Sequence, residues 1–169
     1  MMIKTILNNN AVIAIAENEK EVVIVKNGIG FNSKKGMVLK DNDMEKVFIL
    51  QEKNVSDDMI HLLSLISEEY IEVSKKIVDY GRTVLKTGVH DSIYVTLSDH
   101  IELAVSRKKK GIAFDNAMTW SIKKTYREEY HIGEVALKII QIECGVTLPE
   151  EEAGLIALHF VNAKIHNEP

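Results

Sequence analysis

The sequence predicts an α+β protein organised by domains, with a small antiparallel β-sheet domain at residues 1–55 and an all-α bundle of about five helices at residues 56–169. Two observations carry this prediction. Short runs of β-branched residues recur before residue 54, whereas apolar residues recur at intervals of three to four after it. In addition, 46% of the 169 residues are hydrophobic, which is enough for a real core.

Three apolar runs predict the strands of the small domain, namely "AVIAIA" (11–16), "EVVIV" (21–25) and "KVFIL" (46–50). Polar or glycine-bearing segments separate them, which favours an antiparallel sheet. In residues 11–16 and 22–25, the side chains that would point to either face of the sheet are apolar. A strand in a sheet with one solvated face should instead alternate apolar and polar residues. A unit of this size has little material to cover two faces, so we expect a homodimer formed through the sheet.

Five helical segments are predicted beyond residue 54. Ser56 is a candidate N-cap, Asp57 and Asp58 suit the positive end of the helix dipole, and apolar residues then repeat as far as Ile77. Glycine closes two later segments, and Pro149 with three glutamates opens the last. The other predicted helices span residues 91–111, 115–130, 132–144 and the segment from Pro149 onward.

The charge is unevenly distributed between the two predicted domains. The chain carries 21 basic and 25 acidic residues, a net charge of −4. Residues 1–55 hold eight of the basic and seven of the acidic residues, so only this part has a positive balance. If the chain binds a polyanion, the small domain is the candidate.

Composition also bears on location. One cysteine, Cys144, excludes an internal disulfide, and no apolar run approaches the roughly 18 residues of a membrane span. The N-terminus has no basic stretch followed by an apolar core, so it does not read as a signal peptide. We therefore expect a cytoplasmic protein with no membrane partner.

The segment "KNGIGFNSKKG" (26–36) allows several interpretations. A phosphate-binding loop fails on spacing, and no strong helix follows to offer its N-terminus. A tight turn between strands remains open. RNA binding is the other interpretation, because single-stranded or distorted RNA is bound by cations, amide groups and a stacking ring. The residues that supply them are Lys26, Asn27, Phe31, Asn32, Lys34 and Lys35.

The segment "LNNN" (7–10) is a second candidate contact. Asparagines are poor strand formers and natural turn residues, so a bend before the first full strand is one interpretation. Their amides also offer donors and acceptors to base edges, which makes RNA contact the alternative.

Six histidines are present, and none pair at the spacing of helical metal ligands, so we expect no metal site and no cofactor. His100 and His159 lie inside strong helical patterns. Asp99 is adjacent to His100, and Glu152 is two helical turns before His159 on the same face. Each histidine is either a hydrogen-bonded core residue or one oriented by a carboxylate as a phosphate acceptor.

These segments resemble a known family. Residues 1–55, with "LNNNAVIAIA", "KNGIGFNSKKG" and "EKVFIL", resemble the co-antiterminator RNA-binding domain of the BglG/SacY/LicT transcriptional antiterminators. Residues 56–169, with "DSIYVTLSDHIELAVSR", "YREEYHIGEVALKII" and "LPEEEAGLIALHFVNA", resemble the first PTS regulation domain of the same proteins.

The resemblance implies a mechanism of transcription antitermination. In this family the small domain binds, as a dimer, a hairpin in leader mRNA and thereby blocks an overlapping terminator. The helical domain is regulated by histidine phosphorylation, with the sugar-specific enzyme II or HPr of the phosphotransferase system as donor. By motif match, His100 in "LSDH" and His159 in "IALHF" occupy the phospho-acceptor positions.

The resemblance also implies RNA contacts. Asn8, Asn10, Gly28 and Phe31 match the family pattern, and the pair "KK" at Lys34 and Lys35 is expected to face phosphate. Asn27 departs from the pattern, because the family often has a cation in this region. We expect Lys26 to substitute for it.

The family normally carries a second regulation domain, so we expect the chain to be a fragment. The sequence thus predicts a non-enzymatic antiterminator. One alternative is a DNA-binding regulator with the same regulation domain, which would need a helix-turn-helix in the first 55 residues. Another is a phosphocarrier enzyme that uses His100 or His159 as a relay.

Overall fold

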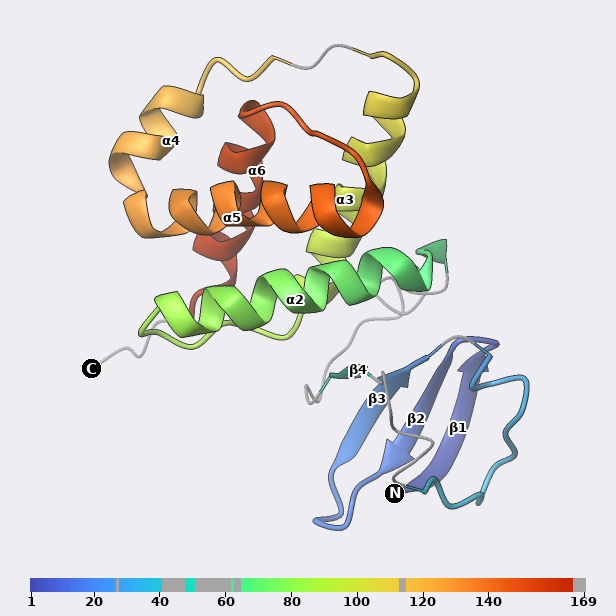
Figure 1. The fold of residues 1–169 in the computed structure, drawn as a ribbon. Coiled ribbons are helices and arrows are strands. Elements are labelled where there is room, and N and C mark those ends of the chain that lie inside the picture. Colours follow the sequence, from blue (N-terminus) through green and yellow to red (C-terminus); the bar gives the residue numbers. More distant parts are fainter. Residues whose placement is uncertain (27, 41–47, 51–61, 63–64, 113–114, 166–169) are drawn as a thin grey trace. The chain divides into compact units, whose positions relative to one another are not determined.

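The computed structural model describes residues 1–26, 28–40, 48–50, 62, 65–112 and 115–165. The chain divides into two compact units, Met1–Glu68 and Glu69–Pro169 (Figure 1). The predicted site residue Asn27 and the helix start predicted at Ser56 lie outside the described residues.

The small unit is a four-stranded antiparallel sheet in the order β1-β2-β3-β4 (Figure 1). The predicted strands are confirmed as β2 (Ala11–Ile15) and β3 (Glu21–Val25), and β4 (Phe48–Leu50) lies within the third predicted run. Sequence reasoning missed β1 (Met2–Asn8), which pairs with β2 along its length. The polar residues Lys4, Thr5 and Asn8 mask it, because an edge strand carries such residues without cost to the core.

One face of this sheet holds a closed hydrophobic core. Val12 opposes Ile24 and Ala14 opposes Val22 across β2 and β3. The cluster is completed by Ile3 from β1 and by two residues outside the strands, Ile29 and Leu39. Leu39 follows a segment that runs beside β1, where Ile3 N donates to Met37 O (2.9 Å).

Burial on the second face explains the unusual apolar pattern. Ala11, Val23 and Val25 are buried there, so residues on both faces of these strands are buried. The burial of both faces, which the apolar pattern predicted, is therefore observed in a single chain. Dimerisation through the sheet stays a prediction.

Five helices make up the described part of the second unit (Figure 1). They are α2 (Glu68–Val84), α3 (Ile93–Lys109), α4 (Thr119–Thr125), α5 (Arg127–Cys144) and α6 (Glu151–Ala163). The all-α class is confirmed. Within those residues, no helix is long and apolar enough to cross a membrane.

The boundary between the third and fourth predicted helices was wrong. The backbone leaves the helical region at Tyr126 (φ −120°, ψ 66°), so α4 ends at Thr125 and α5 begins at Arg127. Residues 127–130 thus belong to α5. The predicted glycine end is correct, because Gly145 adopts φ 68° and its N–H donates to Gln141 O.

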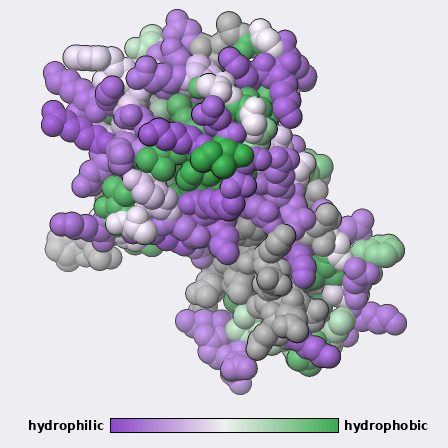
Figure 2. Space-filling model, in the orientation of Figure 1, coloured by the Kyte–Doolittle hydropathy of each residue, from purple (hydrophilic) through white to green (hydrophobic). Residues whose placement is uncertain are grey.

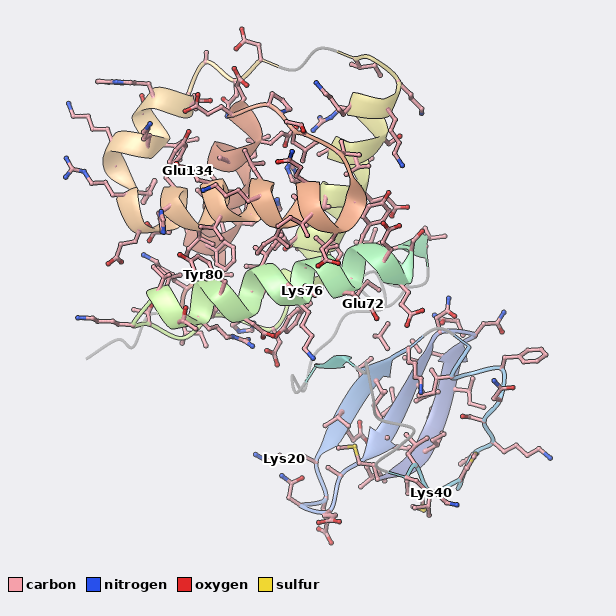
Figure 3. All side chains as sticks on the ribbon, in the orientation of Figure 1. Lys20, Lys40, Glu72, Lys76, Tyr80 and Glu134 are labelled. Carbon is pink, nitrogen blue, oxygen red and sulfur yellow. The ribbon has the colours of Figure 1, made fainter. Side chains whose placement is uncertain are left out.

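Close backbone contact positions α5 against α6. A Cβ atom on Gly133 would lie 2.1 Å from the carbonyl oxygen of Ala153, so this crossing requires glycine. On α2, Tyr80 Oη lies 2.8 Å from His131 Nε2, and Lys76 Nζ lies 2.5 Å from Glu143 Oε1, both on α5 (Figure 3).

A short backbone bridge ties the start of α3 to the end of α6. Val89 pairs with Lys164, and His90 N donates to Ala163 O (2.8 Å). The core between these helices contains Leu97, Ile101, Ile156 and Phe160, all of them fully buried. Hydrophilic side chains cover much of the visible surface of this unit (Figure 2).

Candidate RNA interface and candidate phosphorylation site

Two turns of the small unit interlock through backbone and amide groups. Asn8 Oδ1 accepts a hydrogen bond from Asn10 N (2.8 Å), which closes the first turn. Asn10 Oδ1 accepts from Gly28 N (2.9 Å), and Asn10 O accepts from Lys26 N (2.9 Å). The segment 8–10 therefore forms one local structure with Lys26 and Gly28, which belong to a segment predicted separately.

Two glycines make this contact sterically feasible. Gly28 adopts φ 74°, a left-handed conformation that residues with a side chain rarely take. A Cβ atom on Gly30 would lie 1.8 Å from Asn8 O, and Gly30 N donates to Asn9 O (2.9 Å). Sequence reasoning did not include Gly30 among the site residues. The second glycine of "GIG" was the available signal, but glycine is needed there because of Asn8, which lies 22 positions earlier in the sequence.

Beyond this turn the predicted contacts are exposed. Phe31 is 79% exposed, so its ring contributes little to the core and is open to a stacking partner. Lys34 and Lys35 are exposed, and the next residue, Gly36, donates its N–H to Ile3 O (2.8 Å). These lysines therefore precede the segment that runs beside the edge strand β1.

The two predicted phospho-acceptor histidines meet in the helical unit. His100 lies on α3 and His159 lies on α6, 59 positions apart in the sequence. Their ring centroids are 5.0 Å apart and the rings are tilted by 56°. The separate predictions of His100 and His159 thus fall on one site.

A buried carboxylate adjoins His100. Glu152 is only 2% exposed, and its Oε2 lies 2.8 Å from His100 Nε2. Its other oxygen, Oε1, accepts from Arg107 Nη2 at 2.9 Å. One carboxylate of α6 therefore joins two side chains of α3.

This arrangement corrects the sequence-based pairing of Glu152 with His159. Seven residues along a helix span about 10 Å, which is too far for a side-chain hydrogen bond even on one face. Sequence reasoning missed Arg107 as a site residue. The signal was weak because its partner lies on another helix.

Burial sets the protonation of His159. Removal from solvent, and secondly the proximity of His100, lower the pKa of His159 to about 4. The His159 ring is therefore neutral near neutral pH, and its unprotonated nitrogen has a lone pair. A neutral imidazole is the form that can accept a phosphoryl group. Among the described residues, no cluster of side chains is suited to a metal ion.

The two units together define a class of protein, in which a small sheet with interlocked turns is joined to a helical unit with a histidine pair. The sequence matches the CAT RNA binding domain over residues 1–57 and the PRD domain over residues 75–163. The chain therefore belongs to the family of proteins that carry a CAT RNA binding domain and a PRD domain.

Similar proteins are transcription antiterminators. The chain is 42% identical to transcription antiterminator LicT of Bacillus subtilis over 168 residues, covering 99% of this chain and 61% of that protein. It is 35% identical to the β-glucoside operon antiterminator of Dickeya chrysanthemi over 165 residues, covering 98% and 58%. The chain thus spans about three fifths of the length of these relatives.

The fold also matches a solved structure. The crystal structure of GlcT CAT-PRDI is 31% identical in sequence and covers 96% of each chain, with a TM-score of 0.78. That structure contains the same two kinds of domain in the same order, which confirms the predicted fold class.

Proposed function

We propose that this chain is a sugar-responsive, RNA-binding transcriptional antiterminator. It binds a hairpin in leader mRNA as a homodimer, and phosphorylation of His100 and His159 regulates it. The phosphoryl donor is a sugar-specific enzyme II or HPr of the phosphotransferase system. We assign RNA binding to residues 1–55 and regulation to residues 56–169, and the protein acts as a regulator rather than as an enzyme.

The histidine pair is the observation that carries this proposal. Two histidines from different helices lie with ring centroids 5.0 Å apart in a chain that begins with a CAT RNA binding domain. A core histidine needs no second histidine beside it. Reversible phosphorylation explains why both rings occupy one site.

Charge explains how phosphorylation could act. A phosphoryl group adds about −1.5 to −2 charge at neutral pH. Glu152, with 2% of its surface exposed, already places a negative charge beside His100. A second anion in this low-dielectric site is repelled and poorly solvated, which biases the helical unit toward another arrangement.

We assign RNA binding to Asn8, Asn10, Lys26, Asn27, Gly28, Phe31, Lys34 and Lys35, and the interlocked turns support the assignment of Asn8, Asn10, Lys26 and Gly28. Asn8 Oδ1 accepts from Asn10 N and Asn10 Oδ1 accepts from Gly28 N, so these amides are held in place before RNA arrives. Phe31 supplies an exposed ring for stacking, and the lysines supply charge for phosphates. Because these side chains follow one another along a short segment, one hairpin can contact them together.

The RNA assignment is tested by binding of the full chain to a sugar-operon leader hairpin and to a hairpin with scrambled loops. Phe31→Ala should weaken binding by about 1 to 3 kcal/mol if the ring stacks on a base. Trp120→Ala is the matched control, because Trp120 is also 69% exposed but belongs to the helical unit. Equal affinity for both hairpins, or an equal loss in both variants, would contradict the assignment.

The regulatory assignment is tested by incubation with purified phosphotransferase proteins and mass spectrometry. We expect label on His100 or His159 and none on a double His→Ala variant. His131→Ala is the control, since His131 lies on α5 and bonds Tyr80. Label that persists in the double variant would refute the site.

The alternative of a DNA-binding regulator is not favoured. Strands β1 to β4 and their turns account for most of the described residues among the first 50, and no helix-turn-helix occurs in that described part.

A further inference from the structure

We propose that Glu152 selects the nitrogen of His100 that accepts the phosphoryl group, by holding the proton on Nε2 and leaving Nδ1 as the nucleophile. This inference rests on the proposed phosphorylation of His100 and deepens it. Glu152 acts here as a positioning residue, since it touches the histidine and not the transferred group.

The hydrogen bond to Glu152 determines the tautomer. His100 Nε2 lies 2.8 Å from Glu152 Oε2, and the other carboxylate oxygen accepts from the Arg107 guanidinium. An ionised carboxylate only accepts hydrogen bonds, so Nε2 must carry the proton. In the neutral ring the lone pair is then on Nδ1.

The opposite ring orientation is unfavourable. Rotation of the imidazole by half a turn about its bond to Cβ would place a ring carbon beside Oε2. The carboxylate would then lose one of its two polar contacts while remaining 2% exposed. Leaving a buried charge without its partner is costly, so the packing of Glu152 holds the ring in place.

The edge of the His100 ring that bears Nδ1 is the edge left for a donor. In the described part of the chain, the hydrogen bond of this ring joins Nε2, and not Nδ1, to Glu152. The His100 side chain is 16% exposed, which is consistent with one open edge and one edge facing Glu152.

Transfer of the phosphoryl group to Nδ1 requires no movement of a proton. The Nδ1 lone pair attacks the phosphorus of a phosphocysteine or phosphohistidine of the donor protein. The new N–P bond forms as the donor's P–S or P–N bond breaks, and the donor atom keeps the bonding electrons. The ring gains positive charge with Nε2–H still in place, and Glu152 stabilises that charge as carboxylates stabilise imidazolium in hydrolases.

The same contact explains the pairing of Glu152 with Arg107. A carboxylate that orients a histidine must stay ionised and must not rotate. The Arg107 guanidinium binds the oxygen that His100 leaves unused, so both oxygens are fixed. Carboxylates that orient metal-ligating histidines are commonly worth about 10- to 100-fold in activity, and we take the same range for Glu152 and His100.

The tautomer is measured first, on the unmodified protein labelled with ¹⁵N-histidine. Long-range ¹H–¹⁵N correlation spectra should show neutral His100 protonated on Nε2, with its signals assigned through a His100→Gln variant. A ring protonated on Nδ1 would overturn the inference. This measurement needs neither a donor nor a substitution of Glu152.

The acceptor nitrogen is measured second, with phosphoramidate as a small donor. We expect the phosphoryl group of His100 on Nδ1, identified by ³¹P–¹⁵N couplings. Glu152→Gln should slow the modification of His100 by about 10-fold or more and give both isomers, because the amide can donate as well as accept. Glu151→Gln is the matched control from the same turn of α6 and should behave as the native chain.

These outcomes separate the two proposals. Label on Nε2 of His100 in the native chain, or unchanged rate and isomer in Glu152→Gln, would overturn the role of Glu152 while leaving phosphorylation intact. Failure of the phosphotransferase proteins to label His100 or His159 would instead remove the proposed regulation. The phosphoramidate and tautomer results would be unaffected by that failure.

Discussion

The RNA face and the histidine site are built by opposite means. The RNA face joins two turns through backbone groups and the Asn10 amide, and its residues Phe31, Lys34 and Lys35 are exposed. The histidine site is formed by side chains of α3 and α6, and its central carboxylate is 2% exposed. A surface site is fixed by glycine and asparagine in turns, whereas a buried site depends on which helices pack together.

Replacement of the two glycines in close backbone contact, Gly133 and Gly30, should cause the largest losses of stability or binding. Each replacement should affect only the unit that contains it. Gly133→Ala places a methyl group against the Ala153 carbonyl, which helix backbone cannot easily relieve. We expect a loss of about 3 kcal/mol or more in unfolding free energy. Trp120, the single tryptophan, lies on α4, so its fluorescence during urea unfolding reports this unit.

Gly30→Ala is the counterpart in the small unit, where the methyl group would meet Asn8 O. It should abolish hairpin binding and speed amide hydrogen exchange at Val12 and Ile24, yet leave the tryptophan unfolding curve in place. If Gly30→Ala shifted the Trp120 transition as much as Gly133→Ala does, the two sites would not be energetically separate.

The second prediction concerns pH and applies only to the buried site. The pKa of His159 is lowered to about 4 in the folded chain, whereas an unfolded histidine titrates near 6.5. Between these values the unfolded state binds more protons, so stability is complete above pH 6.5 and is lost as the pH falls through 4. The loss is about 3 kcal/mol.

Urea unfolding followed by Trp120 fluorescence at pH 7 and pH 4 checks this. His159→Gln should reduce the difference between the two pH values, while His131→Gln, on an exposed part of α5, should keep it. An identical pH response in the native protein and in His159→Gln would contradict the assigned protonation of His159.

The difference in construction also explains what the sequence could predict. Strands β2 and β3, the helix end at Gly145, and the histidines His100 and His159 were identifiable because each depends on local pattern. The partner of His100 was not, because no periodicity within α6 indicates contact with α3. β1 was missed for a different reason: its polar residues are tolerated at a sheet edge.

The third prediction tests whether charge at the RNA face acts through phosphates. If Lys34 and Lys35 each pair with a phosphate, replacing both by alanine should reduce the slope of log affinity against log salt by about 2. Lys20→Ala is the control, because Lys20 is exposed in the turn at the opposite end of β2 and β3 (Figure 3). An unchanged slope in the double variant would remove both lysines from the interface.

The smallest expected effect concerns an exposed ion pair in the helical unit, which is compared with the buried pair of Glu152 and Arg107. Lys76 and Glu143 join α2 to α5, but their side chains are 55% and 35% exposed. Solvent screens such a pair, and ordering two long side chains offsets most of the remaining attraction. Lys76→Ala should therefore change the unfolding free energy by no more than about 0.5 kcal/mol, measured by Trp120 fluorescence in urea. A loss well above 1 kcal/mol would mean that exposed pairs also hold these helices, and that burial is not what distinguishes Glu152.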